Sequence, residues 1–358
     1  MDRTELLLKE LTEANGVPGY EQEIRRIMAR ELEGNVDEIL RDRLGSIVGR
    51  KAGTSDRPRV LVIGHMDEIG FMVKEVDKSG FIKFLPLGGW WPHVALGQRM
   101  RVITSKGPVI GVIGSKPPHL LEDSERTKVQ KISDMILDVG AQDGFNVRKK
   151  LGVKEGDPIV PDSEFTILGN PKLYLSKAFD NRMGCAAALD VVRKFARVKH
   201  PNTIYAGGTA QEEVGLRGAQ TLTYLVDPDV CFCVDVGVAQ DLPPDPYVKR
   251  EKLGSGPSVL VYDARMIPNL GLRDLVVKTA EEKKIPFHLT VMERGASDGG
   301  PVHLSRLGVP TIYLGAPVRY IHGHNGIMNR TDYDNTVKLI VEVIKKLDKK
   351  TVRSFTEG

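Results

Sequence analysis

Helical and strand-like patterns of apolar residues alternate along most of the chain. The spacing predicts helices over 3–13 and 21–33, separated by a break at Gly16, Pro18 and Gly19. A β-branched run over 59–63 is typical of a buried strand. After residue 173 the predicted strands are 203–210, 229–236, 258–262, 286–292 and 309–314, and the predicted helices are 182–197, 215–224, 270–284 and 331–349. Such alternation is typical of an α/β domain with a mostly parallel sheet.

The pattern changes between about residues 70 and 166. Short apolar runs are separated there by Gly-, Pro- and Ser-containing turns, which favours a β-barrel or sandwich; the runs are 71–76, 81–85, 100–104, 108–113 and 165–168. We therefore predict a three-layer α/β/α domain with a mixed sheet, formed by 1–69 and 167–358. A small β-barrel-like insert, 70–166, interrupts it.

Composition and charge exclude several classes of protein. Among 358 residues, 41% are hydrophobic and 27% are charged, an ordinary globular balance. The net charge of +4 is spread along the chain, and only 345–353 is locally basic, so a nucleic-acid partner is not expected. No run approaches the roughly 20 apolar residues of a membrane span. Three cysteines do not make a disulfide framework. These features predict a cytoplasmic protein with no membrane partner.

Acidic and His residues follow the predicted strands. His65 and Asp67 close the strand 59–63, and the others come from four further segments: Asp180, the pair Glu212 and Glu213, Asp235, and His322. The carboxyl ends of parallel strands meet in one crevice, where ligands bind. We therefore expect these side chains to converge at one edge of the sheet.

Converging carboxylates point to bound cations, because without them the charges repel and some groups must protonate. Each residue alone has a simpler explanation: a lone Asp at the end of a strand is usually an N-cap or turn residue. A metal site is favoured because all of these acidic and His residues occur together, in this order along the chain. His and carboxylate ligands without a Cys cluster suit zinc, cobalt or manganese in an open hydrolytic site. His324 competes with His322 as the last ligand.

Longer motifs around these residues give a more specific interpretation. The sequence resembles the co-catalytic metallopeptidases of clan MH and, within them, peptidase family 42, the tetrahedral aminopeptidases. The resemblance covers nearly the whole chain, insert included. Its motifs are Gly64-His65-Met66-Asp67-Glu68-Ile69-Gly70, Ala178-Phe179-Asp180-Asn181-Arg182, Gln211-Glu212-Glu213-Val214-Gly215, Val234-Asp235, Arg319-Tyr320-Ile321-His322, and, in the insert, Gly97-Gln98-Arg99 and 111–119.

The resemblance implies a role for each site residue. Asp180 would bridge two divalent metal ions, zinc or cobalt by preference, with manganese also compatible. His65 and Asp235 would complete one metal site, and Glu213 and His322 the other. Glu212 would be the general base for a metal-activated bridging water, and Asp67 would hold His65 by its far ring nitrogen. The implied activity is removal of N-terminal residues from short peptides.

The resemblance also implies a homo-oligomer, in which the insert forms dimers that assemble into a tetrahedral dodecamer. The segment before the last ligand, 294–300, departs from the family's Gly-Gly-Thr-Asp-Ala pattern but keeps a hydroxyl and the Asp. Alternatives are a deacylase or carboxypeptidase on the same metal scaffold, a glycosidase, or a non-catalytic binding homologue. Side-chain preference stays open; Lys252, Arg265 and Arg294 could favour acidic residues.

Overall fold

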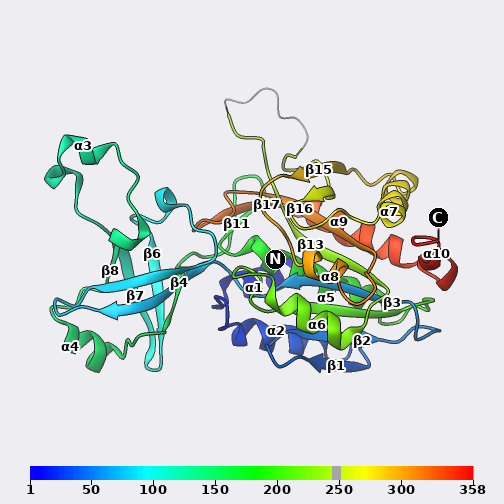
Figure 1. The fold of residues 1–358 in the computed structure, drawn as a ribbon, viewed down its shortest axis with the longest axis horizontal. Helices are drawn as coiled ribbons and strands as arrows, with labels where there is room; N and C mark the ends of the chain where they lie inside the picture. Colours follow the sequence, from blue (N-terminus) through cyan, green and yellow to red (C-terminus); the bar gives the residue numbers. More distant parts are fainter. Residues whose placement is uncertain (244–250, 358) are drawn as a thin grey trace.

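The protein, described here as a computed structural model covering residues 1–243 and 251–357, has two parts. Figure 1 shows a larger α/β part that contains both termini and a smaller β-rich part that projects from one side. The N-terminal helix α1 (Arg3–Glu13) begins with a capping box, in which Asp2 accepts from the Glu5 backbone and Glu5 accepts from the Asp2 backbone. Helix α2 (Gln22–Leu32) follows the Gly/Pro break, as predicted.

A mixed sheet forms the centre of the larger part. Its strands run in the order β1 (Glu38–Arg41), β2 (Ile47–Lys51), β12 (Thr203–Thr209), β3 (Arg59–His65), β13 (Val230–Val238), β16 (Thr311–Arg319), β17 (Gly326–Asn329), β11 (Leu173–Ser176) and β10 (Thr166–Ile167). Strands β12, β3, β13 and β16 are mutually parallel. A further pair, β14 (Ser258–Asp263) and β15 (His288–Met292), joins through β16.

Helices cover both faces of this sheet, so the predicted three-layer α/β/α class is confirmed. One face carries α1, α2, α5 (Phe179–Phe195), α7 (Leu270–Glu282) and α9 (Arg330–Ile344), and the other carries α6 (Arg217–Val226) and α8 (Gly299–His303). Alternate residues of β3 enter different cores: Val60 and Val62 lie in one, and Leu61 and Ile63 in the other. The short helix α10 (Lys349–Arg353) ends the fold.

The smaller part is a closed antiparallel barrel, as the turn-rich pattern predicts. Its strands follow the order β4 (Gly70–Val76), β5 (Ile82–Leu87), β8 (Ile136–Asp138), β7 (Gly107–Gly114), β6 (Arg99–Thr104) and β9 (Pro158–Pro161). Trp90 stacks on Phe71 in the barrel core and donates its indole N–H to the Gly70 carbonyl. The short helices η1 (Pro92–Val94), η2 (Pro118–Leu120), α3 (Asp123–Arg126), η3 (Ile132–Asp134), α4 (Gly144–Asn146) and η4 (Val147–Leu151) connect these strands.

Three details differ from the sequence-based prediction. The run 165–168 was expected among the inserted strands, but Thr166 and Ile167 pair with β11 of the large sheet, because Phe165 packs on Tyr174 and Phe179 of that part. Strand β16 was expected to end at 314, yet it pairs with β13 as far as Val318. The final helix ends at 344, and α10 follows as a separate turn.

The three cysteines are free and buried, in keeping with small apolar side chains. Within residues 1–243 and 251–357, no helix is long and apolar enough to cross a membrane.

Candidate metal centre

The parallel strands bring the predicted residues to one edge of the sheet. His65 ends β3 opposite Thr209, the last residue of β12, which leads into Glu212 and Glu213. Asp235 lies within β13, beside Gly315 of β16, because the pairing of these two strands continues beyond the predicted end. His322 follows β16, and Asp180 lies in the first turn of α5.

These residues form two groups that share Asp180. His65, Asp180 and Asp235 make one group, and Asp180, Glu213 and His322 make the other; the ligand atoms of each lie within 4.8 Å of one another. One Asp180 oxygen is 3.1 Å from Nε2 of His65, and the other is 3.5 Å from Nε2 of His322. Asp180 therefore lies between the groups, with one carboxylate oxygen facing each.

Both imidazoles present the same nitrogen to the centre. Nδ1 of His65 lies 3.0 Å from the Asp67 carbonyl oxygen, and Nδ1 of His322 lies 2.8 Å from the Gly89 carbonyl oxygen. Since a carbonyl only accepts, each Nδ1 carries the proton and donates it. Each Nε2 then faces the carboxylates, and once it gives up any proton its lone pair can bind a metal.

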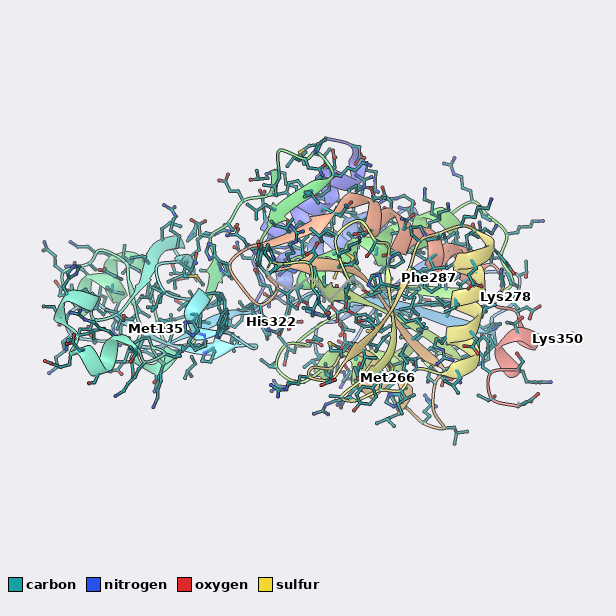
Figure 2. The ribbon with its side chains drawn as sticks, turned by 90° about the horizontal axis from the view of Figure 1, so that it is seen from above. Met135, Met266, Lys278, Phe287, His322 and Lys350 are labelled. Carbon is teal, nitrogen blue, oxygen red and sulfur yellow. The ribbon has the colours of Figure 1, made fainter. Side chains whose placement is uncertain are left out.

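The insert reaches the centre through Gly88 and Gly89. Figure 2 places His322 where the inserted barrel meets the larger part. Gly88 has φ +87°, and a Cβ there would lie 3.0 Å from a Glu213 carboxylate oxygen; a Cβ at Gly89 would lie 3.1 Å from Nδ1 of His322. Glycine therefore lets the backbone approach closely enough to orient His322.

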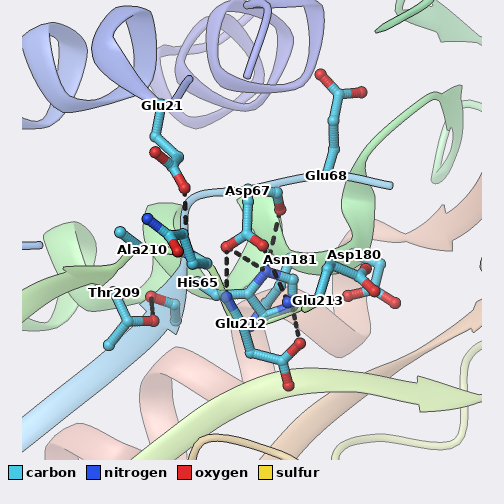
Figure 3. A network of polar contacts seen from close by, with 12 residues as sticks. Glu21, His65, Asp67, Glu68, Asp180, Asn181, Thr209, Ala210, Glu212 and Glu213 are labelled. Atoms are coloured by element: carbon cyan, nitrogen blue, oxygen red, sulfur yellow. Dashed lines mark hydrogen bonds and ion pairs between the residues drawn. The ribbon is translucent and has the colours of Figure 1, made fainter. Parts of the chain in front are cut away.

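Asp67 organises the loop after β12. Its carboxylate accepts from the backbone N–H of Glu212 at 3.0 Å and of Glu213 at 2.9 Å (Figure 3). The same carboxylate lies 3.6 Å from Nδ1 of His65, so the closer contact to that ring comes from the Asp67 carbonyl. Glu213 joins a metal-binding group, whereas Glu212 lies beside the other group, 3.9 Å from Nε2 of His65. The adjacent glutamates thus occupy different positions in the centre.

Burial and the excess of negative charge shift the pKa values of the carboxylates and of His322 at the centre. Burial and, next, the nearby Asp180 carboxylate raise the pKa of Glu213 to about 7. Burial also raises the pKa of Glu212 and Asp235 well above their usual range. Burial alone would lower the pKa of His322, but the Asp180 and Glu213 carboxylates raise it to about 10. The centre therefore favours added positive charge.

The donor set fits divalent cations of the zinc type. Each group offers one imidazole nitrogen and carboxylate oxygens, with no thiol, and that mixture suits zinc, cobalt or manganese. Both groups line one cavity of about 450 Å³, together with Glu212, so ions there would remain accessible to a substrate. His324 does not face this cavity, because its Nε2 contacts the Asp162 carbonyl oxygen at 3.1 Å.

Several polar residues near the centre were not predicted. Buried Asp298 accepts a hydrogen bond from the Thr209 hydroxyl, and its position in the 294–300 segment was the only sequence signal for it. Glu21 accepts from the Gln211 backbone at 3.0 Å, although the pattern placed it at the start of a helix. Glu68, Lys177 and Arg182 form a fully buried ion cluster that no spacing rule indicates.

Known family profiles and a curated relative match most of the chain. A family profile described as "M42 glutamyl aminopeptidase" matches residues 45–339, and a second, described as "AMPT", matches residues 2–28. The glutamyl aminopeptidase of Lactococcus lactis subsp. cremoris is 36% identical over 350 residues, which cover 96% of this chain and 97% of that protein.

Solved structures of related peptidases superpose on nearly the whole chain. The TET aminopeptidase of the marine sediment archaeon Thaumarchaeota archaeon SCGC AB-539-E09 superposes with a TM-score of 0.96 at 43% identity, over 99% of this chain and 100% of that chain. The Pyrococcus horikoshii TET1 peptidase, which can assemble into a tetrahedron or a large octahedral shell, has a TM-score of 0.85 at 28% identity, over 96% and 100% of the two chains. The chain described here therefore belongs to the M42 family of aminopeptidases, which are peptide hydrolases.

Proposed function

We propose that the protein is a two-metal exopeptidase that removes N-terminal residues from short peptides. The observation that carries the proposal is the pair of ligand groups sharing Asp180 in one open cavity. His65 and Asp235 would complete one site, and Glu213 and His322 the other. Two cations bound there would bring the pKa of a shared water into the neutral range and polarise the scissile carbonyl. We propose zinc or cobalt as the metals, with manganese also compatible.

Glu212 is the proposed general base. It lines the cavity next to the His65 group without belonging to it, so its carboxylate is available for proton transfer. Glu212 takes a proton from the attacking water and later delivers it to the leaving amine. Asp67 fixes the position of Glu212 by accepting from its backbone N–H, and it orients His65 through its carbonyl.

The test is hydrolysis of aminoacyl-p-nitroanilides by protein stripped with a chelator and then supplied with zinc, cobalt or manganese. Matching N-acetylated substrates report whether a free α-amino group is needed. We expect cleavage of free-amine substrates alone, only with metal, and a fall of about 10²- to 10⁴-fold in kcat for Glu212→Gln. Metal analysis of that variant should still give two ions per chain.

Other outcomes would change the assignment. Equal cleavage of N-acetylated substrates would indicate a deacylase or an endopeptidase on the same scaffold. Release of reducing sugar from carboxymethylcellulose, lost in Glu212→Gln, would indicate a glycosidase. Two bound metals without hydrolysis of any substrate would indicate a binding homologue.

We also propose a homo-oligomer built through the inserted barrel. The resemblance to a peptidase that assembles into a tetrahedron supports a dodecamer. Apolar side chains exposed on the barrel, including those of Trp91, Ile110 and Val112, would be covered by a second copy. Sedimentation at micromolar concentration tests this, and a monomeric mass would contradict it. A cytoplasmic location remains a prediction.

A further inference from the structure

The catalytic cavity adjoins a second recess of about 210 Å³. The two spaces share five lining residues: Val236, Val238, Met292, Arg294 and Tyr313. Val236 directly follows Asp235 of the first ligand group, so the recess begins one residue from the centre. The other space next to the centre, bordered by Asp180 and His322, has only about 20 Å³. A substrate side chain beside the reacting carbonyl therefore has room in the 210 Å³ recess.

A buried carboxylate lines this recess. Glu251 is 3% exposed, and its two oxygens accept from the hydroxyl of Ser258 at 2.6 Å and the hydroxyl of Thr290 at 2.7 Å. Gly237 makes this position available, since a Cβ there would lie 2.1 Å from a Glu251 oxygen. The carboxylate thus lies against β13, two residues beyond Asp235.

Glu251 has no lysine or arginine partner in the part of the chain that the structure describes. Among residues 1–243 and 251–357, no Lys or Arg nitrogen lies within 4 Å of it, and the nearest basic group is Nε2 of His288, 3.8 Å away. That nitrogen lies 2.9 Å from the Ser258 hydroxyl, which already donates its proton to Glu251, so His288 donates to Ser258. The Tyr313 hydroxyl donates to the Val236 carbonyl instead. Both hydrogen bonds that the Glu251 carboxylate accepts thus come from neutral hydroxyls, and it can still accept one from a charged donor.

The remaining charges at the recess are exposed. Glu293 and Arg294 line it, and Arg265 and Arg294 line the cavity in front of it; all three side chains are solvent-exposed. Interactions of an exposed charge are weakened by water, whereas a buried charge acts through a lower dielectric. Glu251 therefore dominates the inner end of the recess, and the arginines act at its entrance.

We propose that Glu251 makes this aminopeptidase selective for basic N-terminal residues, lysine or arginine, whose cationic end it binds inside the recess. The inference rests on the proposed function, because it assumes that the N-terminal residue of a peptide lies at the centre. A buried carboxylate that lacks a cation gains most from one that arrives with the substrate. The exposed arginines do not define an acidic-residue site.

The test compares matched p-nitroanilides on the metal-loaded protein. Lysyl is paired with norleucyl and arginyl with citrullyl, so that each pair differs mainly in charge, and glutamyl and leucyl complete the panel. We expect wild-type kcat/KM to be about 30-fold higher for lysyl than for norleucyl, and Glu251→Gln to abolish most of that ratio. Glu293→Gln, which removes an exposed carboxylate from the same recess, should change the ratio less than about fivefold.

Each outcome decides the inference. A wild-type preference for glutamyl or leucyl over lysyl overturns it without any variant, and so does a lysyl-to-norleucyl ratio that Glu251→Gln leaves unchanged. In both cases metal-dependent cleavage would leave the proposed function intact. If the metal-loaded wild type cleaves no member of the panel, the proposed function fails and this inference fails with it.

Discussion

Two clusters of buried charge lie on either side of one short loop. One has its own counter-charges, and the other has an excess of carboxylates. Asp67 and Glu68 are adjacent in sequence, yet their side chains point in different directions (Figure 3). Asp67 faces the candidate metal centre, where carboxylates outnumber imidazoles. Glu68 faces Lys177, whose ammonium lies 2.6 and 2.7 Å from its two oxygens, with Arg182 at 3.4 Å.

The contrast separates a structural charge cluster from a functional one. At Glu68 the chain supplies its own counter-charges, and Lys177 and Arg182 also donate to backbone carbonyls of Ala14 and Gly16 just beyond α1. At Asp180 the chain leaves negative charge in excess and opens the cluster to a cavity. A folded protein tolerates such an excess when cations from outside complete it. This comparison predicts opposite consequences for removing a charge from each cluster.

The largest effect is expected for Asp180→Ala, because both ligand groups lose their shared carboxylate. Metal analysis should show loss of bound ions, and kcat/KM should fall by more than about 10⁴-fold, beyond the loss of a general base alone. Asp190→Ala is the matched control: it lies on the same helix and accepts from the Tyr333 hydroxyl at 2.8 Å, so it should lower stability and keep the metals. Two bound ions in Asp180→Ala would show that the groups were assigned wrongly.

The second prediction concerns the closed cluster. Glu68→Gln leaves Lys177 and Arg182 buried without a counter-charge, and the free energy of unfolding should fall by about 3–5 kcal/mol. Lys177→Met should cost less, since Arg182 still lies near Glu68. Urea unfolding of the metal-free variants measures both. A loss below about 1 kcal/mol for Glu68→Gln would mean that the cluster is not a stabilising one.

The stability loss in Glu68→Gln should also depend on pH, because Lys177 titrates. Burial lowers the pKa of Lys177 to about 8, against the opposing effect of Glu68, while the unfolded side chain titrates near 10.5. The unfolded chain therefore binds more protons between these values, so the cost of burying the ammonium is full below about pH 8 and disappears as the pH rises to 10.5. Without Glu68 the pKa of Lys177 falls further, so the deficit of Glu68→Gln should shrink as the pH rises toward about 8 and stay constant above it.

A smaller effect is expected for Asp67, which positions the backbone of Glu212 and Glu213. Asp67→Asn retains one acceptor oxygen but replaces the other with an amide that cannot accept from the Glu212 or Glu213 backbone. We expect kcat to fall by about 10- to 100-fold, the range for residues that orient ligands from behind. KM for a leucyl substrate should change less than kcat. An equal loss confined to KM would place Asp67 in substrate binding instead.

Much of this organisation follows from sequence, for a physical reason. Parallel strands must end at one edge, so the apolar runs before His65, Glu212 and Asp235 already imply that the three side chains converge. The Glu68–Lys177 pair could not be predicted, because its members come from separate loops whose close approach depends on packing between α1 and α5. Glu251 was equally hidden: the hydroxyls of Ser258 and Thr290 that bind it come together only when β14 and β15 pair in the sheet.

The smallest effect is expected at an exposed ion pair on the inserted barrel. Arg148 binds Glu155 through two hydrogen bonds of 2.6 and 2.7 Å and lowers the pKa of Glu155 to about 2. The pair therefore contributes stability above about pH 4.5 and loses it as the pH falls toward 2. Because both side chains are at least 40% exposed, Glu155→Gln at neutral pH should cost less than about 1 kcal/mol.

High salt should reduce the stability loss in Glu155→Gln but leave the loss in Glu68→Gln unchanged, because a buried cluster is screened far less than a surface pair. An equal salt response in the two variants would remove the distinction between closed and exposed charge in this protein.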